Sequence, residues 1–143
     1  MEPFRKLTES MFASPQISVG DIESAKEHGI TLVINNRPDG EDPSAPHSPE
    51  IEAAAKAAGI EFLAIPVSHA GFSMPQVDAM AQALQNNEGK TLAYCRSGTR
   101  STLLWALARA KMGDDPESIA QAAESAGYDV SAVRPTIDML AAG

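Results

Sequence analysis

The stretch that decides the fold runs from Thr91 to Ser101 and reads TLAYCRSGTRS. Its first four residues, Thr91–Tyr94, predict a strand. From Ser101 onward, apolar residues recur at helical spacing until Gly113 ends the run. A short loop with a glycine between a strand and a helix is typical of an anion-binding turn. In such a turn, successive backbone N–H groups and the helix N-terminus face the same space.

Cys95 lies where the predicted strand meets the loop, and the helix is expected to begin near Arg100. The helix dipole and the neighbouring guanidinium groups favour the thiolate form of the cysteine. We interpret Cys95 as a nucleophile and Arg100 as a bidentate clamp for an oxyanion. Ser101 is expected to assist by donating a hydrogen bond to the departing thiolate. The remaining loop residues are expected to bind the anion: Arg96, Ser97, Gly98 and Thr99.

The alternative interpretation is a buried strand cysteine, with Arg96 and Arg100 directed toward solvent. Four features coincide in this stretch: a strand, a glycine, paired arginines and a helix start. Their coincidence favours the catalytic interpretation.

The rest of the chain alternates short β-prone runs with helical segments bounded by glycine, which indicates an α/β domain. Ile30–Ile34 is apolar and mostly β-branched, which predicts a strand buried on both faces. We expect a single domain over residues 1–143, with a three-layer α/β/α fold and a mainly parallel central sheet of four or five strands. The other predicted elements are a strand over Ile60–Val67 and helices from near Gly20 to His28, from Ser48 to before Gly59, over Met74–Asn87, from Asp115 to Gly127 and over about Ser131–Ala141.

Composition restricts the functional classes. A formal charge of -8 argues against a general nucleic-acid binder and an anionic-membrane binder, because both need a basic surface. No run approaches the roughly 18 to 20 apolar residues that span a bilayer, and the first residues lack an apolar secretory signal. The one cysteine cannot form an internal disulfide, so we expect a reducing, cytoplasmic location.

Arg37 opens the long polar segment Asn35–His47, directly after a predicted strand. Substrates of parallel sheets bind beyond the carboxyl ends of the strands, so Arg37 is expected to reach the same pocket as Arg100. The sequence has no histidines at metal-ligand spacing and no glycine-rich nucleotide loop, so no metal or cofactor is expected. The expected partner is a small anionic or phosphorylated substrate.

The Cys95 loop resembles those of two groups of thiol enzymes, the protein tyrosine and dual-specificity phosphatases and the rhodanese-type sulfurtransferases. The phosphatases typically have five residues between cysteine and arginine, whereas this chain has four between Cys95 and Arg100. The loop therefore looks like the shorter rhodanese loop. A tighter cradle would fit a sulfane sulfur more easily than a tetrahedral phosphoryl group.

The flanking segments Ser14–Gln16, Gly29–Glu41 and Ile65–Val67 resemble the front half of the dual-specificity phosphatase fold. In particular they are similar to the phosphatase-like domain of beta-lactamase hydrolase-like proteins, from about Phe12 to Leu140. Members of that family are described both as phosphatases and as sulfurtransferases. The resemblance implies a cysteine-phosphatase-like fold.

The phosphatase resemblance also implies an aspartate as general acid, about 30 residues before the cysteine. In this chain His69 stands at that position. A histidine can protonate a leaving oxygen near neutral pH, although a loop histidine with no catalytic role fits the sequence too. Asp39, Glu41 and Asp42 are the alternative acids, unless they are merely solvated loop carboxylates.

Three functional hypotheses follow from these residues. The first is a cysteine-dependent phosphatase with a thiophosphoryl intermediate on Cys95. The second is a sulfurtransferase that carries a persulfide on Cys95. The third is a non-catalytic module that binds anions without turnover. The fold-wide resemblance favours the first hypothesis, and the length of the loop favours the second.

Overall fold

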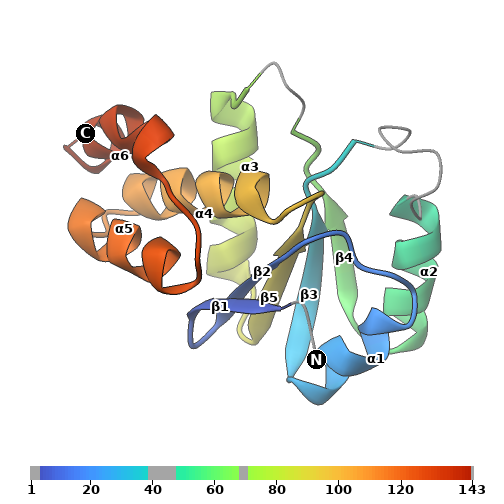
Figure 1. The fold of residues 1–143 in the computed structure, drawn as a ribbon. Coiled ribbons are helices and arrows are strands. Elements are labelled where there is room, and N and C mark those ends of the chain that lie inside the picture. The colour runs from blue at the N-terminus through green and yellow to red at the C-terminus, as the bar shows by residue number, and fades with distance from the viewer. Residues whose placement is uncertain (1–3, 39–47, 68–70, 143) are drawn as a thin grey trace.

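The computed structural model describes residues 4–38, 48–67 and 71–142, which form a sheet between two layers of helices (Figure 1). The strands are β1 (Arg5–Thr8), β2 (Met11–Ser14), β3 (Ile30–Asn35), β4 (Glu61–Ala64) and β5 (Lys90–Tyr94). Their order across the sheet is β1-β2-β5-β3-β4. β1 is antiparallel to β2, and all other neighbours are parallel, so the sheet is mainly parallel as expected.

Helices cover both faces of this sheet (Figure 1). α1 (Asp21–Glu27) and α2 (Ser48–Ala57) lie on one side. The other side carries α3 (Met74–Asn86), α4 (Thr99–Lys111), α5 (Pro116–Ser125), the short 3₁₀ helix η1 (Ser131–Val133) and α6 (Arg134–Ala142). This arrangement confirms the predicted three-layer α/β/α fold. None of the described helices has both the length and the apolar character needed to cross a membrane.

The two central strands supply side chains to a hydrophobic cluster on each side of the sheet. On β3, Leu32 and Ile34 join the cluster beneath α3 and α4, whereas Val33 joins the cluster beneath α1 and α2. β5 alternates in the same way, with Ala93 on the first side and Tyr94 on the second. Both faces of β3 are therefore buried, as predicted for this strand.

The N-terminal hairpin of β1 and β2 was missing from the sequence-based prediction. β1 exposes Arg5, Lys6 and Thr8 and buries only Leu7, so it has no apolar run to mark it as a strand. β2 is only four residues long, and all four are buried because it pairs in parallel with β5. Pairing with β5 therefore determines that β2 is a strand more than the sequence of β2 does.

β4 is shorter than the predicted strand over Ile60–Val67 and ends at Ala64. After Ala64 the chain nevertheless remains hydrogen-bonded to the residues at the end of β3. The N–H groups of Ile65 and Val67 donate to the carbonyls of Asn35 and Asn36, each at 2.9 Å. Pro66, between them, has no N–H to contribute. This connection brings the segment after β4 to the edge of the sheet where β5 ends.

The predicted starts of α3 and α5 are confirmed, and a side chain caps each of these helices at its N-terminus. The Ser73 N–H donates to Gln76 Oε1 at 2.8 Å, and the Ser73 hydroxyl accepts from the Gln76 N–H at 3.5 Å, which completes a capping box for α3. At α5, the Asp115 carboxylate accepts from the Ser118 N–H at 3.0 Å.

Candidate active site

The carboxyl ends of the four parallel strands meet at one edge of the sheet (Figure 1). Cys95 directly follows β5 at this edge, and the chain turns there into α4. Gly98 caps the helix with φ of 91°, a left-handed conformation that glycine adopts without strain. The predicted strand, glycine-containing loop and helix are thus confirmed. The helix begins at Thr99, one residue before the expected start.

Cys95 is fully buried, and its Sγ accepts a hydrogen bond from the Gly98 N–H at 3.1 Å. Its own N–H donates to the Ser14 carbonyl at 3.3 Å. The burial of Cys95 agrees with the alternative interpretation from sequence, a buried strand cysteine. The contact with the Gly98 N–H nevertheless places the sulfur inside the turn.

Arg100 lies in the first turn of α4, and its guanidinium group reaches across to the segment after β4. Its Nη1 donates to the Val67 carbonyl at 2.8 Å. The side chain is half-buried rather than directed into solvent, contrary to the alternative interpretation. This bond uses one of the five N–H donors of the guanidinium group. It fixes the position of Arg100 relative to the connection between β4 and α3.

Ser101 follows Arg100, and its side chain is fully buried. Its Oγ has no hydrogen-bond partner among the residues that the structure describes. A buried hydroxyl without a partner is costly and calls for an explanation, such as a ligand or a reacting group that it serves. The absence of a protein partner is compatible with the role predicted for Ser101.

Ser97 and Thr99 lie on the exposed side of the loop, and their hydroxyl groups bond to each other. Ser97 Oγ donates to Thr99 Oγ1 at 3.0 Å and accepts from the Thr99 N–H at 3.4 Å. Arg96 is exposed, and its carbonyl accepts from the Gln16 N–H at 3.3 Å. An anion-binding role for these three residues stays a prediction.

Arg37 is brought to the same edge of the sheet as the Cys95 loop. It is only 8% exposed, and its Nη1 donates to Gln16 Oε1 at 3.0 Å. Its N–H donates to Asn35 Oδ1 at 2.8 Å, which holds the turn after β3. Gln16 thus contacts both Arg37 and the loop residue Arg96. Gln16 was not singled out as a site residue, although it lies in the quoted segment Ser14–Gln16.

Tyr128 is a residue of this site that sequence reasoning missed. It lies between α5 and α6, and its hydroxyl donates to the Ser97 carbonyl at 3.1 Å. Burial is the main cause that raises the pKa of Tyr128; Arg5 opposes the rise, and Cys95 adds to it. No motif could have identified it, because the contact joins residues 31 positions apart.

The candidate general acids His69, Asp39, Glu41 and Asp42 lie outside the described residues. Their segments begin shortly after Val67 and Arg37, which the structure places at the site edge. Among the described residues, no group of three or more His, Cys, Asp or Glu side chains is arranged to hold a metal ion.

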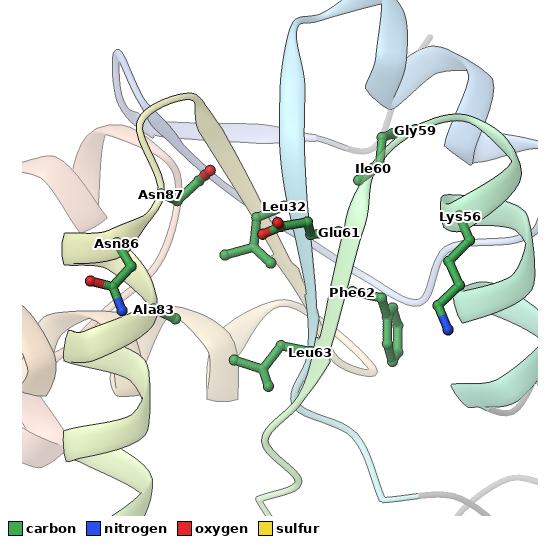
Figure 2. A pocket seen from close by; sticks show the side chains of 10 residues that line it. All are labelled: Leu32, Lys56, Gly59, Ile60, Glu61, Phe62, Leu63, Ala83, Asn86 and Asn87. Carbon is green, nitrogen blue, oxygen red and sulfur yellow. The ribbon is translucent and has the colours of Figure 1, made fainter.

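A pocket of about 530 Å³ lies away from the Cys95 site (Figure 2). It is lined by Gly59, Glu61 and Leu63 around β4, and by Ala83 and Asn87 at the end of α3. Gly59 precedes β4, and Asn87 precedes β5, so these residues mark the amino ends of the parallel strands. Substrates of parallel sheets bind at the carboxyl ends, which argues against this pocket as the reaction site.

The model of the phosphatase-like domain of beta-lactamase hydrolase-like proteins matches residues 3–112. This chain belongs to that family. A beta-lactamase hydrolase-like protein of Agrobacterium fabrum is 32% identical over 128 residues, which cover 89% of this chain and 30% of that protein. The phosphatase-like domain thus spans less than a third of the curated relatives that it matches.

Solved structures share the fold of this phosphatase-like domain. A candidate phosphatase from Neisseria meningitidis superposes with a TM-score of 0.84 and 33% identity, over 98% of this chain and 99% of that chain. Tk-PTP in its active form has a TM-score of 0.75 at 15% identity, over 98% of this chain and 97% of that chain, which shows the fold alone. These structures confirm the cysteine-phosphatase-like fold. The family match begins earlier than the expected Phe12 and ends at residue 112, so α5 and α6 lie beyond it.

Gly98→Ala should destabilise the phosphatase-like domain more than Gly113→Ala does. Both glycines have positive φ, at 91° and 98°, so each substitution loses about 1 kcal/mol to backbone strain. A Cβ on Gly98 would also collide with the Tyr128 hydroxyl and lie 3.3 Å from the Ser14 carbonyl carbon, whereas a Cβ on Gly113 meets nothing within 4 Å. Overpacking adds about 1 to 3 kcal/mol. Urea unfolding of both variants measures the difference, and equal losses would contradict the packing shown here.

Proposed function

We propose that this domain is a cysteine-dependent phosphatase that hydrolyses a phosphate monoester through Cys95. The observation that carries the proposal is the hydrogen bond from the Gly98 N–H to the Cys95 Sγ, at the start of a helix. This contact places the sulfur beside a backbone N–H and the positive end of the α4 dipole, an environment that suits an anionic nucleophile and a bound oxyanion. The family and the fold support phosphatase chemistry at this loop.

In the proposed mechanism, the Cys95 thiolate attacks phosphorus, and the bond from phosphorus to the leaving oxygen breaks. A general acid protonates that oxygen. Water then attacks the thiophosphoryl group and gives a proton to the residue that acted as the acid. This step releases inorganic phosphate, returns the thiolate and restores the acid. Arg100 and the loop amides hold the phosphoryl oxygens during both steps. The Ser101 hydroxyl donates a hydrogen bond to the sulfur as the thiolate departs, which gives its buried Oγ a partner.

The general acid comes from one of the two segments that follow Arg37 and Val67. We propose His69 as the first candidate, because it stands at the position where the family resemblance implies an acid. Asp39, Glu41 and Asp42 are the alternatives. Arg96 supplies positive charge on the exposed side of the loop, where the phosphate group of a small substrate would enter. Arg37, which is buried at the same edge of the sheet, adds positive charge from beneath.

Sulfur transfer is the second candidate, and the loop length favours it. Only four residues separate Cys95 from Arg100, which makes a narrower cradle. In this reaction the thiolate attacks the sulfane sulfur of thiosulfate and displaces sulfite. The resulting persulfide passes its outer sulfur to a thiol acceptor. The nucleophile and the anion cradle are the same in both reactions, so only assays separate them.

Cys95→Ser should abolish turnover of para-nitrophenyl phosphate, because a serine hydroxyl is not ionised at neutral pH. Wild type and variant are compared in parallel phosphatase and thiosulfate sulfurtransferase assays. Intact mass after thiosulfate treatment reports one added sulfur on the wild type if sulfur transfer is the reaction. Turnover of the phosphate ester that persists in Cys95→Ser would exclude the proposed mechanism. Inactivity of the wild type in both assays, with retained phosphate binding, would indicate the non-catalytic module.

Arg100→Lys should lower kcat/KM for the phosphate ester on the order of 10²-fold, because lysine lacks the planar fork that pairs with two oxygens. Arg109→Lys is the matched control on the same helix. Arg109 Nε pairs with Asp114 at 2.6 Å near the far end of α4, so its replacement should leave turnover nearly unchanged. Equal effects of the two substitutions would show that Arg100 is not an oxyanion clamp.

Ser101→Ala should affect stability and activity in opposite directions. Removal of a buried hydroxyl without a described partner leaves the free energy of unfolding unchanged or raises it by about 1 kcal/mol. Loss of the hydrogen bond to the departing thiolate should lower kcat roughly tenfold. Urea unfolding and a single-turnover assay measure the two effects; formation of the intermediate should change less than its hydrolysis. A loss of stability with normal kcat would assign Ser101 a structural role instead.

A further inference from the structure

Tyr128 lies against the Cys95 loop although it belongs to the segment between α5 and α6. Its hydroxyl donates to the Ser97 carbonyl at 3.1 Å. The hydroxyl occupies the space that a Cβ on Gly98 would fill, and Tyr128 Cζ lies 2.8 Å from that Cβ position. The tyrosine therefore packs directly on the residue whose N–H contacts the sulfur.

The Ser97 carbonyl and the Gly98 N–H belong to the same peptide group. In a trans peptide these two groups point in opposite directions, because the unit is planar. The carbonyl faces Tyr128, so the N–H faces the other way, and it is found 3.1 Å from the Cys95 Sγ. The Tyr128 hydroxyl and the Cys95 sulfur thus bind the C=O and the N–H of the same peptide group.

The segment that carries Tyr128 is itself anchored to the rest of the fold. Arg5 Nη1 donates to the Ala126 carbonyl at 3.1 Å, and the Arg5 guanidinium lies 5.5 Å from the centre of the Tyr128 ring. A Cβ on Gly127 would lie 2.7 Å from Arg5 Nη1, so the arginine packs closely against this turn. The tyrosine is therefore held from the β1 side.

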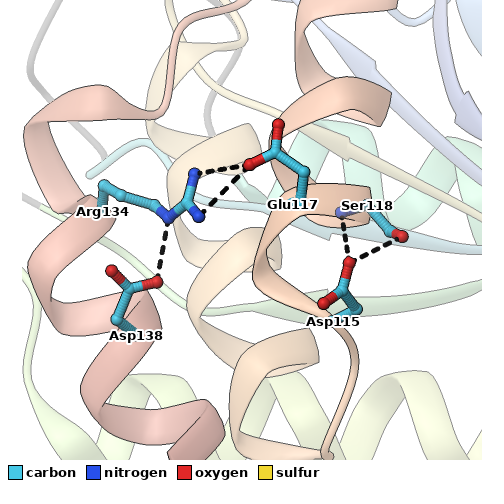
Figure 3. Close-up of polar contacts among 5 residues, drawn as sticks. All are labelled: Asp115, Glu117, Ser118, Arg134 and Asp138. Carbon is cyan, nitrogen blue, oxygen red and sulfur yellow. Dashed lines mark hydrogen bonds and ion pairs between the residues drawn. The ribbon is translucent and has the colours of Figure 1, made fainter.

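An ion pair joins α5 to α6, the two helices that flank this segment (Figure 3). Arg134, at the start of α6, pairs with Glu117 on α5 at 3.4 Å and with Asp138 at 2.9 Å. The family match ends at residue 112. The contact with the loop thus comes from a part of the chain beyond that match.

We propose that Tyr128 is a positioning residue that orients the Ser97–Gly98 peptide group, so that the Gly98 N–H points at the Cys95 thiolate. The inference rests on the proposed role of Cys95 as the nucleophile and adds a residue that the loop motif does not contain. Without the hydroxyl, this peptide group loses its outer hydrogen bond and can rotate away from the sulfur. Tyr128 is half-buried, and this partial burial raises the pKa of its hydroxyl, so the hydroxyl stays protonated at neutral pH and remains a donor.

The test is Tyr128→Phe, which keeps the ring beneath Arg5 and removes only the donor. The readout is the rate of Cys95 alkylation by iodoacetamide against pH; the chain has one cysteine, so the signal is unambiguous. The pH of the half-maximal rate should rise by about 0.5 to 1 unit, a three- to tenfold loss of thiolate on the acid side. The charged groups that the described contacts place here (Arg5, Arg37, Arg96 and Arg100) are all unchanged in this variant.

The pH midpoint separates orientation from mere loosening of the structure. A loosened loop would expose the buried sulfur, which raises the limiting rate at high pH and lowers the midpoint because the thiolate is better hydrated. Loss of the amide orientation alone raises the midpoint instead. Asp129→Asn is the control in the same segment, because the Asp129 carboxylate contacts Ser131 and not the loop. Its profile should superimpose on that of the wild type. Urea unfolding confirms that each variant is folded.

Arg5→Lys supplies a second variant that keeps the charge and weakens the anchor of the tyrosine. It should shift the midpoint in the same direction by a smaller amount. Unchanged midpoints in both folded variants would overturn the proposal. Alkylation needs no turnover, so a shifted midpoint in a protein without phosphatase activity would uphold the role of Tyr128 and reject the proposed function instead.

Discussion

The site depends on one backbone constraint, the positive φ of Gly98. That conformation turns the chain so that the Gly98 N–H reaches back to the sulfur of Cys95 at 3.1 Å, and α4 begins at the next residue. Any side chain at this position would be strained and would collide with Tyr128. Because the turn is this tight, Arg100 and Ser101 lie in the first turn of the helix. The sulfur, the amide, the guanidinium group and the hydroxyl therefore come from seven consecutive residues, Cys95–Ser101.

The sheet supplies the rigidity that such a turn needs. The base of the loop is held from both neighbouring strands. The Cys95 N–H donates to the carbonyl of Ser14, the last residue of β2, and the Tyr94 carbonyl accepts from the N–H of Asn36, just after β3, at 2.8 Å. β5 lies between these strands and is buried on both faces. The end of β5 therefore has little freedom, and the remaining degrees of freedom lie in the peptide groups of the loop. Those groups are the ones that Gln16 and Tyr128 contact from outside.

How much could be predicted from sequence depended on how local each feature is. The strand before Cys95, the glycine turn and the capped start of α3 each follow from residues within a few positions of one another. The β1–β2 hairpin was missed because its exposed polar residues carry no strand pattern, and only pairing with β5 buries β2. Tyr128 was missed for a related reason. Its contact with Ser97 depends on how α5 and α6 pack on α4, and no local spacing encodes that packing.

The charge distribution bears on the size of the proposed substrate. The chain carries a net charge of -8, yet Arg37, Arg96 and Arg100 gather at one edge of the sheet, and Arg5 lies next to Tyr128. Charges beyond about 8 Å are largely screened at physiological ionic strength, so a small anion at the loop responds mainly to these arginines. A long polyanion would also extend over the acidic remainder of the surface and be repelled there. Under the proposed function, this charge distribution would suit a compact phosphorylated substrate better than a long polyanion.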